Sequence, residues 1–119
     1  MQVFRFLHFQ VYIEAKRFYK DMVILTRLFP REYWELADQI RRSALSVCLN
    51  IAEGSAKRSD KDFNRFIEIS LGSINEVVAG LDLAHEGSLI TKDRLEGFLG
   101  EATNITKQLG GFSRSLLKK

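Results

Sequence analysis

Apolar residues that recur at alternating steps of three and four positions dominate this sequence, in four successive stretches. Such spacing places side chains along one face of an α-helix. The last stretch is the most regular, with the stripe Leu95, Phe98, Ala102, Ile105, Leu109, Phe112 and Leu116. The three earlier stripes are Val11, Ala15, Phe18, Met22, Leu25 and Phe29; Tyr33, Leu36 or Ala37, Ile40, Ala44, Val47 and Ile51; and Phe63, Phe66, Ile67, Ser70, Ile74, Val77, Leu81 and Ala84.

Four residues mark where these helices begin and end. Pro30 ends a helix that starts near residue 6, and it opens a second helix that extends to about residue 57. Ser59 begins an S-x-x-D pattern that predicts the N-cap of the third helix, and Gly87 predicts its end. Thr91 predicts the N-cap of the fourth helix. Because short connections between long helices imply antiparallel neighbours, we predict an all-α, up-down-up-down four-helix bundle.

The composition is that of one globular domain. With 119 residues the chain is long enough for one domain and too short for two, so residues 1–119 are predicted to form a single domain. The hydrophobic content of 45% argues against disorder. Cys48 is the single cysteine, which fits a reducing compartment. Arg5, His8 and Gln10 interrupt any signal-peptide core, and no stretch of about 18 residues is apolar and uncharged. We therefore expect a cytoplasmic protein that has no membrane contact.

The charge is small in sum but uneven along the chain. The formal net charge is +3, yet residues 41–65 hold six basic and three acidic side chains. Antiparallel stacking brings the start of the first helix, the junction of the second and third helices and the C-terminus to one end of the bundle. The basic residues expected at that end are Arg5, Lys57, Arg58, Lys61, Arg65, Arg114, Lys118 and Lys119. The acidic residues expected at the opposite end are Glu32, Glu35, Asp82, Glu86, Asp93 and Glu96.

A cluster of cations can bind nucleic-acid phosphates, or it can simply keep a surface solvated. The sequence leaves both interpretations open. The residues that would contact phosphates are Arg41, Arg42, Lys57, Arg58, Lys61 and Arg65. No aromatic residue lies within residues 57–61, so stacking on bases is not predicted.

Small and polar residues interrupt the apolar faces of the second and third helices. Gly72 and Gly80 each cost about 1 kcal/mol of helix stability relative to Ala, which suggests that another segment presses against them. The polar residues beside the stripes are Asn50, Glu53, Ser73 and Glu76. They either tie one bundle together internally or form a polar subunit interface. In either case Arg41 or Arg42, from the same or another subunit, could neutralise a buried carboxylate among them.

The sequence contains no pattern typical of catalysis, metal binding or cofactor binding. The nearest approach to a bundle metal motif is Asp82 with His85, and no second copy of the motif exists. Cys48 lies on an apolar helix without a triad signature, and we predict that it packs rather than reacts. Phosphate-loop and dinucleotide signatures are absent. We therefore predict no catalytic residue, no metal site and no cofactor, and a protein that is not an enzyme.

Several blocks of the sequence resemble a known family. The two most specific are residues 39–44 (QIRRSA) and residues 50–55 (NIAEGS), and residues 28–30, 59–66 and 72–76 add to them. These blocks resemble the bacterial four-helix-bundle proteins encoded by intervening sequences in large-subunit ribosomal RNA genes. The accessory protein of diversity-generating retroelements is similar in fold. Cys48 and the Lys-Arg pair at residues 57–58 depart from the family pattern, which more often has a small residue or Pro and a Gly-Arg pair.

The resemblance implies a homopentamer with a positive surface that binds nucleic acid, and a contact with reverse transcriptase in the retroelement relatives. The leading hypothesis is a non-enzymatic, pentameric homo-oligomer that binds RNA or DNA without base specificity. In this hypothesis the six arginines and lysines above contact phosphates, while Asn50, Glu53 and Glu76 organise the bundle or its interface. The alternative is a protein-interaction scaffold, whose arginines pair with an acidic protein partner or a reverse transcriptase.

Overall fold

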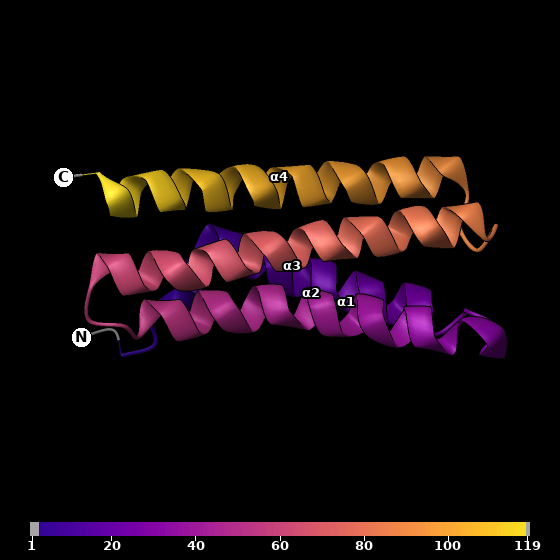
Figure 1. Cartoon of the computed structure of the whole chain (residues 1–119), viewed down its shortest axis with the longest axis horizontal. Coiled ribbons are helices and arrows are strands. Elements are labelled where there is room, and N and C mark those ends of the chain that lie inside the picture. The colour runs from indigo at the N-terminus through magenta and orange to yellow at the C-terminus, as the bar shows by residue number, and fades with distance from the viewer. Residues whose placement is uncertain (1–2, 119) are drawn as a thin grey trace.

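The chain folds into four long helices that lie side by side (Figure 1). The structure, a computed structural model, describes residues 3–118. Its helices are α1 (Gln10–Thr26), α2 (Trp34–Ser55), α3 (Asp60–Glu86) and α4 (Lys92–Leu117), and 3-10 turns at Arg5–His8 and Arg31–Tyr33 precede α1 and α2. Successive helices run in opposite directions in a rod 46 Å long, and residues 3–118 contain no strand. The predicted all-α, up-down-up-down bundle is confirmed.

Three sequence signals set helix ends as predicted. The Ser59 hydroxyl accepts a hydrogen bond from the Asp62 amide at 3.1 Å at the start of α3. The Thr91 hydroxyl accepts one from the Arg94 amide at 3.2 Å at the start of α4. Gly87 follows α3, and its amide bonds back to a carbonyl of the last turn. These contacts satisfy backbone groups that a helix end leaves without intrahelical partners.

The N-terminal helix is shorter than predicted. Residues 5–8 form a separate 3-10 turn, and α1 begins only at Gln10. Phe9, between the two, is extended, with φ −69° and ψ 127°. The centroid of its ring lies 5.3 Å from that of Phe112 and 6.4 Å from that of Phe63. The helix breaks at Phe9 because this ring closes the end of the hydrophobic core.

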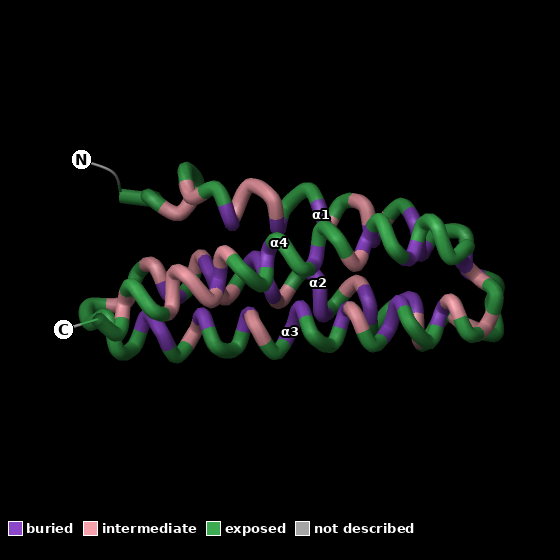
Figure 2. The backbone as a smooth tube through the Cα atoms, turned by 90° about the horizontal axis from the view of Figure 1, so that it is seen from above, coloured by how far each residue is buried: buried purple, intermediate pink, exposed green. Residues whose placement is uncertain are grey.

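The buried residues of the four apolar stripes form one hydrophobic core, and Figure 2 shows buried positions recurring along each of the four helices. Each helix contributes side chains that are almost completely buried, such as Phe18, Ile51, Leu81 and Leu109. The stripe residues that remain only half-buried are Tyr33, Leu36, Phe66, Phe112 and Leu116. They lie toward the ends of the rod, where fewer neighbours surround a side chain. Within residues 3–118, no helix has an apolar stretch long enough to span a lipid bilayer.

The seam between α2 and α3 is the closest in the bundle. A Cβ atom placed on Gly80 would lie 2.6 Å from Cγ1 of Ile40, so only glycine fits there without a shift. The buried Ser70 hydroxyl donates to the carbonyl of Val47 at 3.0 Å across the same seam. At Gly72, by contrast, a Cβ atom would meet no atom within 4 Å. The prediction that another segment presses against these glycines is confirmed for Gly80 and is wrong for Gly72 within the chain.

Alanine substitutions at Gly80 and Gly100 should change stability in opposite directions. Gly80→Ala pushes a methyl group into the buried Ile40 side chain, and overpacking of this kind costs roughly 1–3 kcal/mol. Gly100→Ala adds a methyl group in open space on α4, which stabilises a helix by about 0.5–1 kcal/mol. Urea unfolding followed by circular dichroism measures both effects against the wild-type chain. A Gly80→Ala variant as stable as Gly100→Ala would contradict the close contact of α2 with α3.

Candidate nucleic-acid interface

The basic residues of the α2–α3 turn lie at the end of the rod where α4 finishes and the described chain begins (Figure 1). Arg5 Nη2 donates to the carbonyl of Ser55 at 3.2 Å, which joins the N-terminal turn to the end of α2. Ser113 donates to Asn64 Oδ1 at 2.5 Å, which joins the end of α4 to the start of α3. We call this group the basic end, and it consists of Arg5, Lys57, Arg58, Lys61, Arg65, Arg114 and Lys118. Lys119, which was expected with them, lies outside the described residues.

Two cations of the basic end share one aromatic ring. Lys57 Nζ and Arg65 Cζ each lie 5.0 Å from the centroid of the Phe66 ring. Lys57 also forms an ion pair with Glu53 at 3.2 Å. Arg65 makes a longer contact of 3.9 Å with Asp62. Periodicity alone assigned Phe66 to the core, and its part in holding two cations follows from the edge position that its ring takes in the folded bundle.

A hollow of about 430 Å³ opens beside the basic end, between the start of α3 and the end of α4. Its lining residues are Lys61, Asp62, Asn64, Arg65, Glu68 and Leu117. Asn64 is buried and its amide is already bonded, since it accepts from Ser113 and donates to Glu68 at 3.3 Å. Lys61 and Arg65 remain exposed at the rim. A phosphate group at this hollow would therefore meet two cations, with two carboxylates nearby that limit the strength of binding.

The two ends of the rod differ in charge. The basic end holds seven basic side chains, and Glu53, Asp60, Asp62 and Glu68 lie among them, for a local net charge of +3. The opposite end holds the six predicted acidic residues together with Arg27, Arg31, Lys92 and Arg94, for a local net charge of −2. The bundle is thus electrically polar along its axis. The contrast is moderate because each end also contains residues of the opposite sign.

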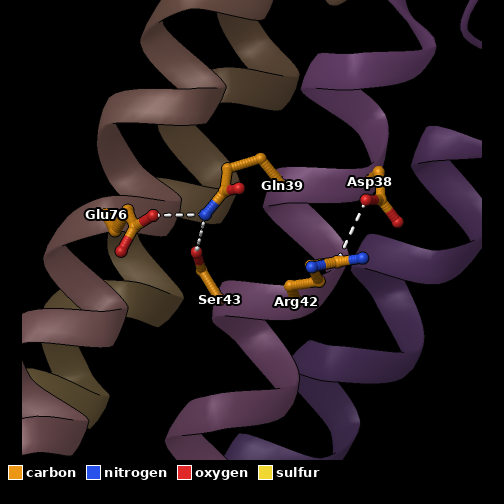
Figure 3. A network of polar contacts seen from close by, with 5 residues as sticks. All are labelled: Asp38, Gln39, Arg42, Ser43 and Glu76. Atoms are coloured by element: carbon orange, nitrogen blue, oxygen red, sulfur yellow. Dashed lines mark hydrogen bonds and ion pairs between the residues drawn. The ribbon is translucent and has the colours of Figure 1, made fainter.

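Arg41 and Arg42 do not join the basic end. They precede Lys57 by about 15 residues, which corresponds to roughly 22 Å along a helix. Arg41 is half-buried, and its Nη1 donates to the Thr26 hydroxyl at 2.9 Å across the α1–α2 seam. Arg42 is exposed, and its Nε lies 3.0 Å from Oδ2 of Asp38, one turn earlier (Figure 3). The predicted set of six phosphate contacts is therefore divided into four residues that lie together and two that lie apart.

Of the four polar residues beside the stripes, Ser73 and Glu76 bond across the α2–α3 seam, and Asn50 and Glu53 bond within α2 and at its end. Figure 3 shows Gln39 Nε2, which donates to the Glu76 carboxylate and, at 3.4 Å, to the Ser43 hydroxyl. Ser73 shares a hydrogen bond of 2.8 Å with Ser46. Asn50 Nδ2 donates to the Ser46 carbonyl at 2.9 Å, so it extends the same network. The structure thus gives Asn50, Ser73 and Glu76 internal partners.

Glu53 and Glu76 do not bind the arginines that were expected to neutralise them. Both carboxylates are exposed. Glu53 pairs with Lys57 at the end of α2, and Glu76 accepts from Gln39. The predicted pairing with Arg41 or Arg42 is therefore wrong within the chain, because those guanidinium groups bind Thr26 and Asp38 instead.

Cys48 lies on the buried side of α2 and is 4% exposed. Burial raises the pKa of its thiol to about 11, although a backbone hydrogen bond and the charge of Lys16 act in the opposite direction. A thiol with this pKa keeps its proton at neutral pH and is a poor nucleophile. The geometry supports a packing role for Cys48.

The α1–α4 seam is the loosest of the four and is lined by carboxylates. Glu14 accepts hydrogen bonds from Gln108 at 2.9 Å and from Asn104. Two turns further along α1, Asp21 faces Glu101 of α4, and both residues line a hollow of about 340 Å³. Burial raises the pKa of Glu101, and the charge of Asp21 and a hydrogen bond between the two carboxyl groups raise it further. Within residues 3–118, no three His, Cys, Asp or Glu side chains are grouped to hold a metal ion.

Fold and charge together define an antiparallel four-helix-bundle protein with one basic end. The sequence profile of the 23S rRNA-intervening sequence protein family matches residues 8–111, and the chain belongs to this family. A solved structure with the same fold is that of a protein with unknown function from the S23 ribosomal protein family of Bacteroides thetaiotaomicron. That protein is 29% identical, with a TM-score of 0.78, and the match covers 92% of this chain and 99% of that one. Among curated proteins, none matches.

Glu101→Gln should stabilise the bundle at neutral pH and lose this advantage in acid. The raised pKa of Glu101 means that the folded state favours the protonated form of this carboxyl group. Its contribution to stability is therefore fully present below the ordinary pKa of Glu, and it is lost as the pH rises through the raised pKa. An amide cannot ionise and keeps a hydrogen-bonding group beside Asp21. Thermal unfolding at about pH 7 and about pH 4 measures the difference. The control is Glu96→Gln on exposed α4 surface, and an equal effect of Glu101→Gln at both pH values would contradict the assignment.

Proposed function

We propose that this chain is a non-enzymatic subunit of a homo-oligomer, a pentamer, that binds the phosphate backbone of RNA or DNA at its basic end without base specificity. The supporting observation is the gathering of seven cations around the α2–α3 turn, with a local net charge of +3. Lys and Arg side chains that neutralise phosphates release counterions, which supplies affinity independent of sequence. The name of the family makes ribosomal RNA the first ligand to test.

Arg58 and Lys61 are the main phosphate contacts in this proposal. Both are exposed, and neither belongs to an ion pair found within residues 3–118. Lys57 and Arg65 contribute to the positive potential, but Phe66 and neighbouring carboxylates already hold them. The proposal leaves out Arg41 and Arg42, since they lie far along α2 from the other cations.

The proposal includes no catalytic step and no cofactor. The buried Cys48 thiol keeps its proton. Glu101 shares its hollow with a second carboxyl group, Asp21, and with no nucleophile. A cytoplasmic location, where ribosomal RNA is found, belongs to the same proposal.

Binding to fragments of ribosomal RNA should be weak, dependent on salt and sensitive to the basic end. If each subunit neutralises about three phosphates, affinity should fall roughly 40-fold between about 50 and about 200 mM salt. Arg58→Glu combined with Lys61→Glu removes two contacts and adds two repulsive charges, so we expect a loss of about tenfold or more at low salt. Fluorescence anisotropy with labelled RNA measures both effects. A labelled RNA of scrambled sequence should bind equally well.

The matched control is Lys92→Glu combined with Lys107→Glu. Both lysines are exposed on α4 and neither belongs to the basic end, and the pair changes the net charge by the same amount. This control should retain most of the affinity. Equal losses in the two variants would show that total charge, and not the basic end, governs binding. No binding by the wild-type chain at low salt would remove the nucleic-acid function altogether.

A different observation favours the second candidate function, a scaffold for an acidic protein partner or a reverse transcriptase. Leu45 and Leu49 are 37% and 55% exposed on α2, within two turns of the exposed Arg42. Exposed apolar side chains next to an arginine are typical of protein interfaces rather than of phosphate contacts. If this surface serves a protein partner, Arg42→Glu should weaken that complex and leave the affinity for RNA unchanged.

A further inference from the structure

Two opposite sides of the bundle carry exposed charges of opposite sign, although α3 also bears the exposed Lys61 and Arg65 of the basic end. Helices α1 and α3 make no close contact with each other, so they occupy diagonal corners of the bundle. Exposed cations on α1 include Lys16, Lys20 and, at its C-terminal boundary, Arg27, and exposed carboxylates on α3 include Glu68 and Glu76. None of these five residues belongs to an ion pair found within residues 3–118. The two carboxylates each accept only an amide hydrogen bond.

The carboxylates of α1 do not neutralise its cations. Glu14 is bonded to side chains of α4, and Asp21 shares a hydrogen bond with Glu101 of α4. Both acids of this helix are therefore turned toward the loosest seam of the bundle. The lysines lie on another side of the helix and keep their charge uncompensated.

Apolar surface accompanies the charges on both helices. On α1, a hollow of about 430 Å³ is lined by Lys16, Arg17, Tyr19, Lys20 and Val23. On α3, Ile69 is 44% exposed and Leu83 is 58% exposed. Between them lies Gly72, where a Cβ atom would meet nothing within 4 Å. A glycine inside a helix costs about 1 kcal/mol relative to Ala, and no contact within the chain requires this one.

The charges on the two helices lie at matching heights along the rod. Arg41 of α2 contacts Thr26, and Gln39 of the same helix contacts Glu76, so Thr26 and Glu76 are nearly level. Helices α1 and α3 run in the same direction, because each is antiparallel to α2 (Figure 1). Ten residues earlier on each helix, Lys16 is level with residue 66. It is therefore about 3 Å in height from Glu68, and Arg27 is within one or two residues of the level of Glu76.

We propose that the outward face of α1 packs side by side and in parallel against the outward face of α3 in a second copy of this chain. Lys16 then faces Glu68, and Arg27 faces Glu76. Ile69 enters the hollow beside Tyr19, and Gly72 allows the two helices to approach closely. The inference rests on the homo-oligomer of the proposed function, for which it names the faces that meet.

A second copy fits these faces because its own surface supplies the complementary charges. Two copies that stand parallel and at equal height bring Lys16 and Arg27 of one α1 opposite Glu68 and Glu76 of the neighbouring α3. The contact joins two different faces, so each copy of a pair keeps its other face free for a further neighbour. Repetition of such a contact closes into a ring when the rotation between copies permits it.

Charge reversal followed by charge exchange tests this pairing. Lys16→Glu with Arg27→Glu places like charges across the contact and should weaken self-association at least tenfold, and so should Glu68→Lys with Glu76→Lys. The variant that carries all four substitutions restores opposite charges and the wild-type net charge, so it should recover the oligomer. Sedimentation velocity of each variant measures the assembly. Circular dichroism checks that these exposed substitutions leave the helices folded, and Lys92→Glu with Lys107→Glu is the control for charge alone.

The outcomes separate this inference from the proposed function. A wild-type oligomer whose size is unchanged by either reversal overturns the α1–α3 pairing and leaves the homo-oligomer intact. Dissociation by both reversals without recovery in the fourfold variant also overturns it. A monomeric wild-type chain removes the homo-oligomer itself, and RNA binding at the basic end is then judged by the anisotropy measurements. Recovery in the fourfold variant, with an unchanged control, supports the pairing.

Discussion

Helices α2 and α3 approach each other over small residues, and this contact sets the geometry of the whole bundle. A Cβ atom on Gly54 would lie 2.8 Å from the ring of Phe63, and one on Gly80 would lie 2.6 Å from Ile40. The Ser70 hydroxyl donates to a carbonyl of α2 between these two points. Each contact permits only one axial position of α3 against α2, since a shift would drive side chains into backbone. The register of the two helices is therefore fixed at both ends of the seam.

The position of the basic end follows from this register. The end of α2 and the start of α3 are held together, so the short turn between them brings Lys57 and Arg58 close to Lys61 and Arg65. Like charges at this distance repel each other, and the bundle offsets part of that cost with carboxylates and with the ring of Phe66. The cationic surface is thus a consequence of helix packing, and it needs no loop of special conformation.

Features that depend on neighbouring residues in the chain were predictable from the sequence, and the contacts of side chains between helices were not. The apolar stripes and the caps at Ser59 and Thr91 depend on residues within one or two turns, so the periodicity placed the stripes and the capping residues placed the helix starts. The direction of Arg41 depends on whether a hydroxyl of α1 lies within its reach, and Thr26 provides one only in the folded bundle. Phe9 breaks the first helix for a similar reason, since its ring fills space left by α3 and α4. At both residues, contacts between helices outweighed what the local sequence pattern predicted.

The charge of this molecule differs between the two ends of the rod and also between two of its sides. Each of these two differences suits a different kind of partner. The axial difference concentrates cations at one end, where a phosphate backbone can lie across the rod. The lateral difference places Lys16 and Glu68 at similar heights on opposite sides, which suits a neighbour that stands parallel. Parallel neighbours all point their basic ends the same way. An assembly of this kind presents several local charges of +3 on one rim, so a single nucleic acid can contact more than one subunit at once. Weak contacts at each end then add up to useful affinity only when the lateral contact holds the copies in parallel.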